Sequence, residues 1–220
     1  MPAKNVIKQY LEGGFYHIYN RGVEKRIVFT DKLDYKIFLS YLKAYLSPPY
    51  PGQVRPVRVS DIHEQIQLIC YCLMPNHFHL LVKQKNRFGI VTFMRRLTNA
   101  YTRYFNERYK RVGPLFQGSY KAVLIQEEPY LLHLTRYIHL NPLDLQTQNR
   151  SHLLAYPYST YGDYLGKRKT SWVHPEEILF FFKTAQKTSF KDVLSYQSFV
   201  EDYVGEFAEI LGELTLDSEE

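Results

Sequence analysis

The sequence predicts an α+β domain with the element order β-α-β-β-α-β, followed by a further helix. Three observations lead to this prediction. Runs rich in β-branched and aromatic residues alternate with longer runs of helical periodicity, a short turn at 74–76 joins two of the strands, and Pro and Gly separate the runs. Such an order is typical of a ferredoxin-like fold, a four-stranded antiparallel sheet with two helices on one face.

The first predicted strand covers 15–20 and ends at Arg21-Gly22. Asp31 can cap the helix that follows, because its carboxylate can accept hydrogen bonds from the first turn. This helix is expected to run to about Tyr45, before the prolines at 48–51, and its apolar stripe comprises Leu33, Ile37, Phe38, Tyr41 and Leu42. Residues 53–64 are expected to be irregular.

Two further strands are predicted over 65–73 and 77–83, and a long helix over 89 to about 111. The apolar positions of that helix are Val91, Met94, Leu97, Tyr101, Tyr104 and Phe105, and its polar face is basic, with Arg95, Arg96, Arg103, Arg108, Lys110 and Arg111. A fourth strand is expected over 120–126. The helix after it should stop at about Leu140, because the residue before Pro142 avoids the helical region.

The rest of the chain predicts a helical extension. Short helices are expected near 175–185 and 189–197, and an acidic helix near 199–213. We therefore divide the chain into a domain over 1–165 and a C-terminal extension over 166–220, whose role no motif indicates.

Composition indicates a protein that meets polyanions. Residues 201–220 hold eight acidic side chains and no Lys or Arg, so the rest of the chain carries 28 basic against 14 acidic residues, a net charge of +14. Phosphate neutralisation dominates affinity for nucleic acids, and aromatic side chains, here including 20 Tyr, can stack on unpaired bases. No apolar run reaches the ~18 residues of a membrane span, and the first residues lack a secretory signal. A cytoplasmic location is expected, which also fits the two neighbouring cysteines, Cys70 and Cys72.

Two histidines flank Phe78 in the motif His77-Phe78-His79, which lies on a predicted strand. Side chains on a strand alternate between faces, so both imidazoles should point to one side and Phe78 to the other. Two imidazoles so placed form half of a site for a divalent metal ion. A packed or surface role for the histidines is the alternative, and it is weakened by a second group of polar residues downstream.

A structural zinc site is a further alternative. Cys70, Cys72, His77 and His79 have the spacing C-x-C-x4-H-x-H, whereas zinc sites usually have C-x2–4-C and a longer gap before the histidines. The cysteines are therefore expected to be small buried hydrophobic residues.

The second group lies on the helix predicted over 129–140. Tyr137 and Asn141 are one turn apart on the same face of this helix. A tyrosine phenolate can attack a phosphodiester and retain the product as a phosphotyrosine, and a divalent ion can polarise the phosphate. An amide oxygen can complete the ligand set of the ion. Spacing alone does not select Tyr137 over Tyr120 or Tyr130.

Four strings resemble a known family: 71–82 (YCLMPNHFHLLV), 113–118 (GPLFQG), 137–142 (YIHLNP) and 156–161 (YPYSTY). Together, over roughly residues 12–165, they resemble the single-tyrosine HUH transposases, and within these the REP-associated group, relatives of the IS200-like transposases. Ser119 stands where many relatives have a basic residue.

The resemblance implies a metal-dependent endonuclease and strand transferase that acts on single-stranded DNA hairpins through a 5′-phosphotyrosine. It implies Mg²⁺ or Mn²⁺ as cofactor, with His77, His79 and Asn141 as metal ligands and Tyr137 as the nucleophile. The candidate DNA contacts are Arg95, Arg96 and Arg103 on the basic helix and Lys121 on the fourth strand. No membrane association is expected, and a homodimer is compatible with the sequence.

A function of another class stays open. A domesticated relative could bind structured single-stranded DNA or RNA without cutting it, since an antiparallel sheet with aromatic residues is also the layout of RNA-recognition domains. The presence of both histidines, Tyr137 and Asn141 favours catalysis, because a protein that only binds does not need them together.

Overall fold

The computed structural model has the predicted order of strands and helices, and it describes residues 10–50, 61–145, 151–184 and 195–203. The ferredoxin-like part consists of β1 (Phe15–Arg21), α1 (Lys32–Leu46), β2 (Ile66–Met74), β3 (His77–Gln84), α4 (Gly89–Arg108) and β4 (Lys121–Ile125). The elements that follow are α5 (Glu128–Leu140), η2 (Asn141–Leu145), α6 (Ser151–Ala155), α7 (Tyr161–Tyr164), α8 (Glu176–Thr184) and α9 (Tyr196–Glu201).

The four strands form one antiparallel sheet in the order β2-β3-β1-β4. Strands β2 and β3 are joined by the predicted turn at Pro75-Asn76. The central strands are β1 and β3, and their register pairs Tyr19 with His79 and Arg21 with His77. The order and orientation confirm the predicted ferredoxin-like fold.

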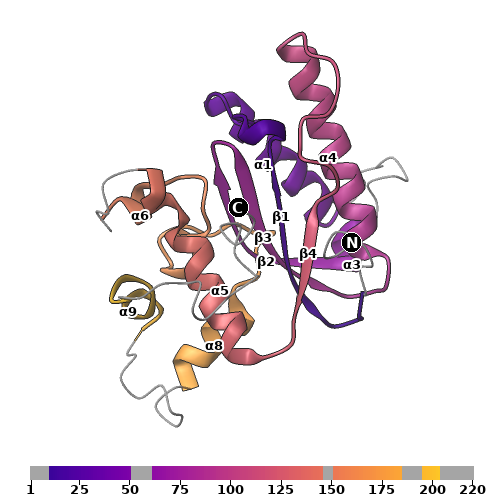
Figure 1. Ribbon diagram of the computed structural model, residues 1–220. Helices are drawn as coiled ribbons and strands as arrows, with labels where there is room; N and C mark the ends of the chain where they lie inside the picture. Colours follow the sequence, from indigo (N-terminus) through magenta and orange to yellow (C-terminus); the bar gives the residue numbers. More distant parts are fainter. Residues whose placement is uncertain (1–9, 51–60, 146–150, 185–194, 204–220) are drawn as a thin grey trace, which may run out of the picture.

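Helices cover both faces of the sheet (Figure 1). On one face, α1 and α4 bury a cluster that includes Phe38, Leu97 and the strand residue Phe78. On the other face, α5 and the C-terminal helices bury a second cluster with Cys70, Cys72 and Leu81. The sheet is therefore the middle layer, and different helices and different buried clusters cover its two faces. The elements after β4 form the third layer.

The cap of α1 is as predicted, but its buried stripe is rotated. The Asp31 carboxylate accepts from the N–H groups of Leu33 and Asp34. Leu33 and, on α4, Val91 were predicted to face the core, yet they are 46% and 40% exposed. The buried positions of α1 include Asp34 and Tyr35 instead, because α1 packs against α4 through a polar network at its first turn.

Three local predictions were wrong. Residues 62–64, expected to be irregular, and Gln65, expected to begin the second strand, form the short helix α3 (Ile62–Gln65). One helix was expected near 189–197 and another near 199–213, but α9 continues across the boundary between them, because Ser195 and Ser198 form a capping box that starts the helix at Tyr196. Helix α5 ends at Leu140 as predicted, but Asn141 keeps a helical conformation (φ −46°, ψ −39°) although it precedes Pro142, since the chain continues directly into η2. The predicted helices over 189–194 and 204–213 lie outside the described residues.

The third layer also covers one edge of the sheet, through residues on both sides of the proposed division at 165. The segment 158–174 runs along the outer edge of β2, where Leu73 N–H donates to Tyr158 O (2.9 Å), Thr160 N–H to Tyr71 O (3.0 Å) and His174 N–H to Leu68 O (2.8 Å). Helix α9 packs on α5, where the buried His139 ring lies between the Tyr196 hydroxyl (2.6 Å) and the Thr160 hydroxyl (2.8 Å). The division at residue 165 stays a prediction.

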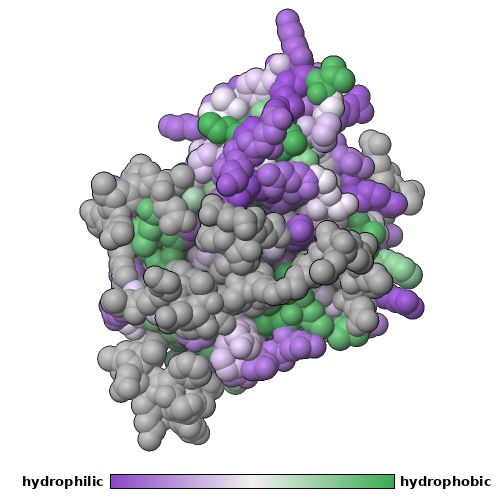
Figure 2. All heavy atoms as spheres, in the orientation of Figure 1, coloured by the Kyte–Doolittle hydropathy of each residue, from purple (hydrophilic) through white to green (hydrophobic). Residues whose placement is uncertain are grey.

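The surface differs between regions. Hydrophilic side chains gather over the upper part of the molecule in Figure 2, where α4 projects past the sheet in Figure 1.

Over the residues that the structure describes, no helix has the length and apolar character needed to cross a membrane.

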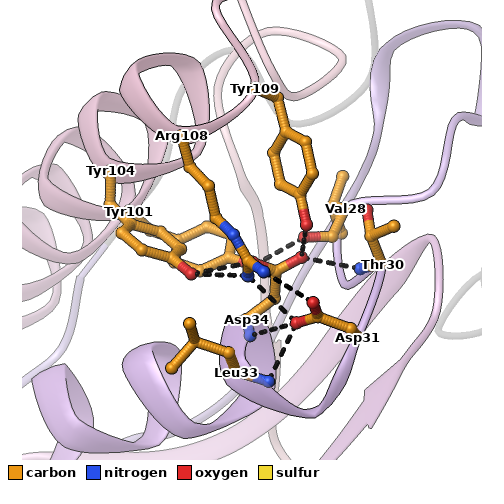
Figure 3. A network of polar contacts seen from close by, with 9 residues as sticks. All are labelled: Val28, Thr30, Asp31, Leu33, Asp34, Tyr101, Tyr104, Arg108 and Tyr109. Atoms are coloured by element: carbon orange, nitrogen blue, oxygen red, sulfur yellow. Dashed lines mark hydrogen bonds and ion pairs between the residues drawn. The ribbon is translucent and has the colours of Figure 1, made fainter.

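Helices α1 and α4 are joined by a buried polar network (Figure 3). The fully buried carboxylate of Asp34 accepts from Arg108 (2.7 Å), from the hydroxyls of Tyr104 and Tyr109 (both 2.9 Å) and from Thr30 N–H (2.8 Å). Arg108 also pairs with Asp31 (2.6 Å), which holds the pKa of the Asp31 carboxyl at about 2. The network fixes the last turn of α4 against the first turn of α1.

Candidate active site

The two histidines of the H-x-H pair point to the face of the sheet that α5 covers. Phe78 between them lies in the cluster under α1 and α4, and is fully buried. The His77 and His79 rings are 4.9 Å apart and nearly perpendicular. The alternation of β3 therefore places the side chains as the sequence predicted.

The hydrogen bonds around His77 fix which ring nitrogen carries the proton. Nδ1 lies 2.6 Å from Asn76 Oδ1, an oxygen that can only accept, so Nδ1 must donate. The Asn76 amide is oriented because its Nδ2 donates to Lys25 O (3.3 Å). Burial lowers the pKa of His77 to about 4, with a further contribution from the Arg21 charge, so the ring is neutral at pH 7. Nε2 then presents a lone pair.

His79 is fully buried and is also held through Nδ1. That atom lies 2.9 Å from Nε2 of His17, whose ring stacks on the His79 ring at 5.1 Å. Burial, together with the neighbouring His77, His17 and Arg21, holds the pKa of His79 well below its usual range. Its Nε2 atom is buried and has no hydrogen-bond partner among the described residues. Buried polar atoms without a protein partner are rare, and they commonly bind water or an ion.

Asn141, at the end of α5, turns its amide oxygen toward this pair. Its Nδ2 donates to Tyr137 O (2.9 Å), which leaves Oδ1 facing His77 Nε2 at 3.4 Å. With His77 neutral and protonated at Nδ1, two acceptor atoms face each other. A cation between them would relieve that repulsion, and ligands of a small divalent ion at about 2.1 Å are separated by a similar distance.

With Nδ1 of His79 donating to Nε2 of His17, the donor set fits a divalent metal ion: two neutral imidazoles with Nε2 lone pairs and one amide oxygen. The hydrogen bonds from Nδ1 are the outer partners that commonly orient metal-binding histidines. A Cys2His2 zinc site is not formed, since no group of three or more His, Cys, Asp or Glu among the described residues is arranged to hold a metal ion. Cys70 and Cys72 are free and fully buried, as predicted.

Tyr137 lies beside the histidines. Its ring meets the His79 ring edge-on at 5.4 Å and the His17 ring at 6.3 Å. The two tyrosines that sequence spacing could not exclude are elsewhere: Tyr120 packs on the opposite face, where its hydroxyl bonds to Tyr10 (2.7 Å), and Tyr130 is exposed near the start of α5. A competitor that sequence analysis missed is Tyr19, whose ring is 6.1 Å from His79.

Sequence analysis also missed two residues of β1. His17 holds His79, and Arg21 pairs with His77 across the sheet. The Arg21 Nε atom is buried without a hydrogen-bond partner among the described residues, although the guanidinium is close enough to lower the pKa of both His77 and His79. The alternation His17-x-Tyr19-x-Arg21 was a signal available in the sequence, but only the strand register places it beside His77.

The four predicted DNA contacts do not lie together. Lys121 pairs with Tyr19 in the sheet, so its side chain is on the histidine face, two strands or about 10 Å from His79. Arg95, Arg96 and Arg103 lie on α4, the layer behind the opposite face. The structure therefore brings His77, His79, Asn141, Tyr137 and Lys121 to one face and leaves the three arginines on another.

Comparison with known proteins finds one family model that matches part of the chain. Residues 58–141 match the sequence model of the IS200-like transposases, and this range contains both histidines, Tyr137 and Asn141. No curated protein matches the chain.

Among solved structures, a REP-associated tyrosine transposase bound to a REP hairpin shares the fold, with 12% identity, a TM-score of 0.50, and 76% of this chain and 95% of that chain covered. A transposase-like protein of Deinococcus radiodurans is similar at 17% identity and a TM-score of 0.38, over 60% of this chain and 93% of the other. The chain is therefore similar to the IS200-like transposases in sequence over residues 58–141, and it shares the fold of a REP-associated tyrosine transposase.

Proposed function

We propose that the protein cleaves and rejoins single-stranded DNA through a 5′-phosphotyrosine at Tyr137, as the chemical step of DNA transposition. The observation that carries this proposal is the convergence of His77, His79 and Asn141 beside the Tyr137 ring, with acceptor atoms facing one another. Packing alone does not explain such an arrangement, because a buried acceptor without a donor costs about 1–3 kcal/mol.

In the proposed step, the Tyr137 hydroxyl oxygen attacks the scissile phosphorus and gives up its proton. The bond from phosphorus to the 3′ oxygen breaks, and the departing oxygen takes a proton to become a free 3′-OH. The 5′ phosphate stays on the tyrosine, so the energy of the phosphodiester is conserved. Attack by a 3′-OH on the phosphotyrosine reverses the step and joins the strands without ATP.

Two cations on the histidine face suit the phosphates of the substrate. Arg21 lies next to His77 in the register, and its guanidinium could hold the non-bridging oxygens at the scissile position, where charge develops. Lys121 lies two strands away and could hold a neighbouring phosphate.

His77, His79 and Asn141 would hold Mg²⁺ or Mn²⁺. Bound there, the ion would polarise the phosphate beside Tyr137. The roles of the protein side chains follow from the structure: Asn76 and His17 orient the two imidazoles, and the Tyr137 carbonyl orients Asn141.

The substrate class is proposed as hairpin-forming single-stranded DNA. The REP-associated tyrosine transposase of similar fold is bound to a REP hairpin. The net positive charge of the chain outside its acidic end supports a polyanionic partner.

The test is incubation with a pool of DNA hairpins and Mg²⁺ or Mn²⁺, followed by denaturing electrophoresis for a covalent protein–DNA adduct. Tyr137→Phe removes only the hydroxyl and should eliminate the adduct, whereas Tyr19→Phe, the matched control on the same face, should retain it. Peptide mapping should find the DNA on Tyr137. An adduct on Tyr19 would refute the residue assignment but keep the reaction class.

Two other outcomes would overturn the reaction. Cleavage by Tyr137→Phe without an adduct would indicate activated water as the nucleophile, and hence a plain nuclease. Tight hairpin binding with no cleavage under either metal ion would favour a relative that binds structured DNA without cutting it.

A further inference from the structure

A second nucleic-acid site can be inferred on the face of the molecule opposite Tyr137. Helices α1 and α4 enclose an open groove of about 750 Å³, lined by the arginines of α4 and by aromatic rings from both helices. The lining residues that matter are Arg95, Arg96, Arg103, Tyr41, Tyr104 and Glu107.

The three arginines outnumber the single acidic side chain of the described lining, Glu107. Among the described residues, no hydrogen bond or ion pair engages the guanidinium of Arg95, Arg96 or Arg103, and Arg95 and Arg103 are exposed. Arg108 on the same helix differs, since Asp31 and Asp34 neutralise it. A groove lined by three guanidinium groups and one carboxylate has a net positive charge and attracts polyanions.

The row of arginines is long enough to contact more than one phosphate of a single DNA strand. Arg95 and Arg103 are eight residues apart, about 12 Å along the helix axis, which is several phosphates long. Arg96 and Arg103 are two turns apart on one side of α4, so the charges form a row rather than a point.

The aromatic rings offer stacking surfaces between the charges. Tyr41 lies close to Arg103 and Glu107, since both charges act on its hydroxyl. The Tyr104 ring is held rigid because its hydroxyl donates to Asp34. Cationic side chains interleaved with half-buried aromatic rings are typical of sites for single-stranded nucleic acid, where the backbone meets the charges and unpaired bases meet the rings.

We propose that this groove binds a single-stranded DNA segment, separately from the strand that is cut. The sheet lies between the groove and the histidine face, so one strand must pass around the molecule to reach both. Binding in the groove does not depend on the proposed cleavage, because the groove shares no residue with the Tyr137 site.

The test uses a fluorescent 12-nucleotide oligo(dT), which forms no hairpin, and measures its affinity as a function of salt. Each phosphate contact contributes a slope of about −0.7 in log K against log salt. Changing Arg95, Arg96 and Arg103 together to Gln should flatten the slope by up to about 2. Lys167→Gln, a charge change on the C-terminal extension, is the control and should leave the slope nearly unchanged.

Two single variants test the groove, because one should raise and the other should lower the affinity for the oligonucleotide. Glu107→Gln removes the acidic side chain of the lining and should tighten binding of the oligonucleotide. Tyr41→Leu keeps the apolar contact but removes the stacking surface, and should weaken binding on the order of tenfold. If Glu107→Gln weakens binding, or Tyr41→Leu has no effect, the strand does not lie in the groove.

The failures of the two proposals are distinguishable. An unchanged slope for the triple arginine variant, with oligo(dT) affinity lost instead in Arg21→Ala, would overturn the groove and place the strand on the histidine face. A flattened slope in a protein that forms no adduct with any hairpin would support the groove and contradict the cleavage proposal. Oligo(dT) affinity in Tyr137→Phe should equal that of the unaltered protein, since Tyr137 is on the other layer.

Discussion

Replacing Asp34 with Asn should destabilise the protein strongly, although the two side chains have the same shape. Oδ1 accepts from Tyr104 and Arg108, and Oδ2 from Tyr109 and Thr30 N–H. An amide has one oxygen, so in either orientation its NH2 group faces two donors. Each buried donor left without an acceptor costs about 1–3 kcal/mol, and a tyrosine hydroxyl can recover part of this by rotating.

The expected loss is therefore about 2–4 kcal/mol of the free energy of unfolding, a large share of the ~5–15 kcal/mol typical of a domain. Urea denaturation would measure it, with an unchanged m-value as the sign of an intact two-state transition. Asp31→Asn is the control. It keeps the capping oxygen and removes only a partly exposed ion pair with Arg108, so its effect should be much smaller. A loss below about 1 kcal/mol for Asp34→Asn would refute the reasoning.

Three further outcomes are expected. His77→Ala and His79→Ala should each abolish adduct formation yet leave most oligonucleotide affinity, which phosphate contacts supply; cleavage by both variants in the adduct assay would refute their assignment as ligands. Arg21→Ala should slow adduct formation at saturating DNA on the order of 10²-fold, with partial recovery in Arg21→Lys, and an unchanged rate would remove Arg21 from the site. Burial lowers the pKa of His133 to about 4 and of His139 to about 3, so below pH 6.5 the unfolded chain takes up protons that the folded protein does not. The free energy of unfolding should therefore fall as pH decreases from about 6.5 to 4, and a flat profile in denaturation experiments would contradict this.

Several features that depend on a single strand or helix were predicted correctly from the sequence. Strand alternation alone puts His77 and His79 on one face and Phe78 on the other, and the carboxylate of Asp31 alone predicts the start of α1. The Asn141 position also follows from helical spacing, although the helical conformation of the residue itself does not follow from the proline after it.

Features that depend on how two strands or helices pack against each other could not be predicted from the sequence. Arg21 reaches His77 only through the register between β1 and β3, and the position of Tyr19 beside His79 has the same origin. The separation of Arg103 from Tyr137 depends on which face of the sheet each helix covers, and helical periodicity does not encode this. Leu33 is exposed because the polar network of Asp34 sets the rotation of α1.

The segment along the outer edge of β2 limits how the sheet could extend into a partner. Its hydrogen bonds to Leu68, Tyr71 and Leu73 occupy backbone groups that an incoming strand would need. In the part of the chain that the structure describes, no strand pairs with the outer side of β4. Two copies joined by a continuous sheet would therefore meet through β4, the strand that carries Lys121. A symmetric dimer of that kind would place a Lys121 from each copy at the seam, and the histidine faces of both copies on the same broad surface.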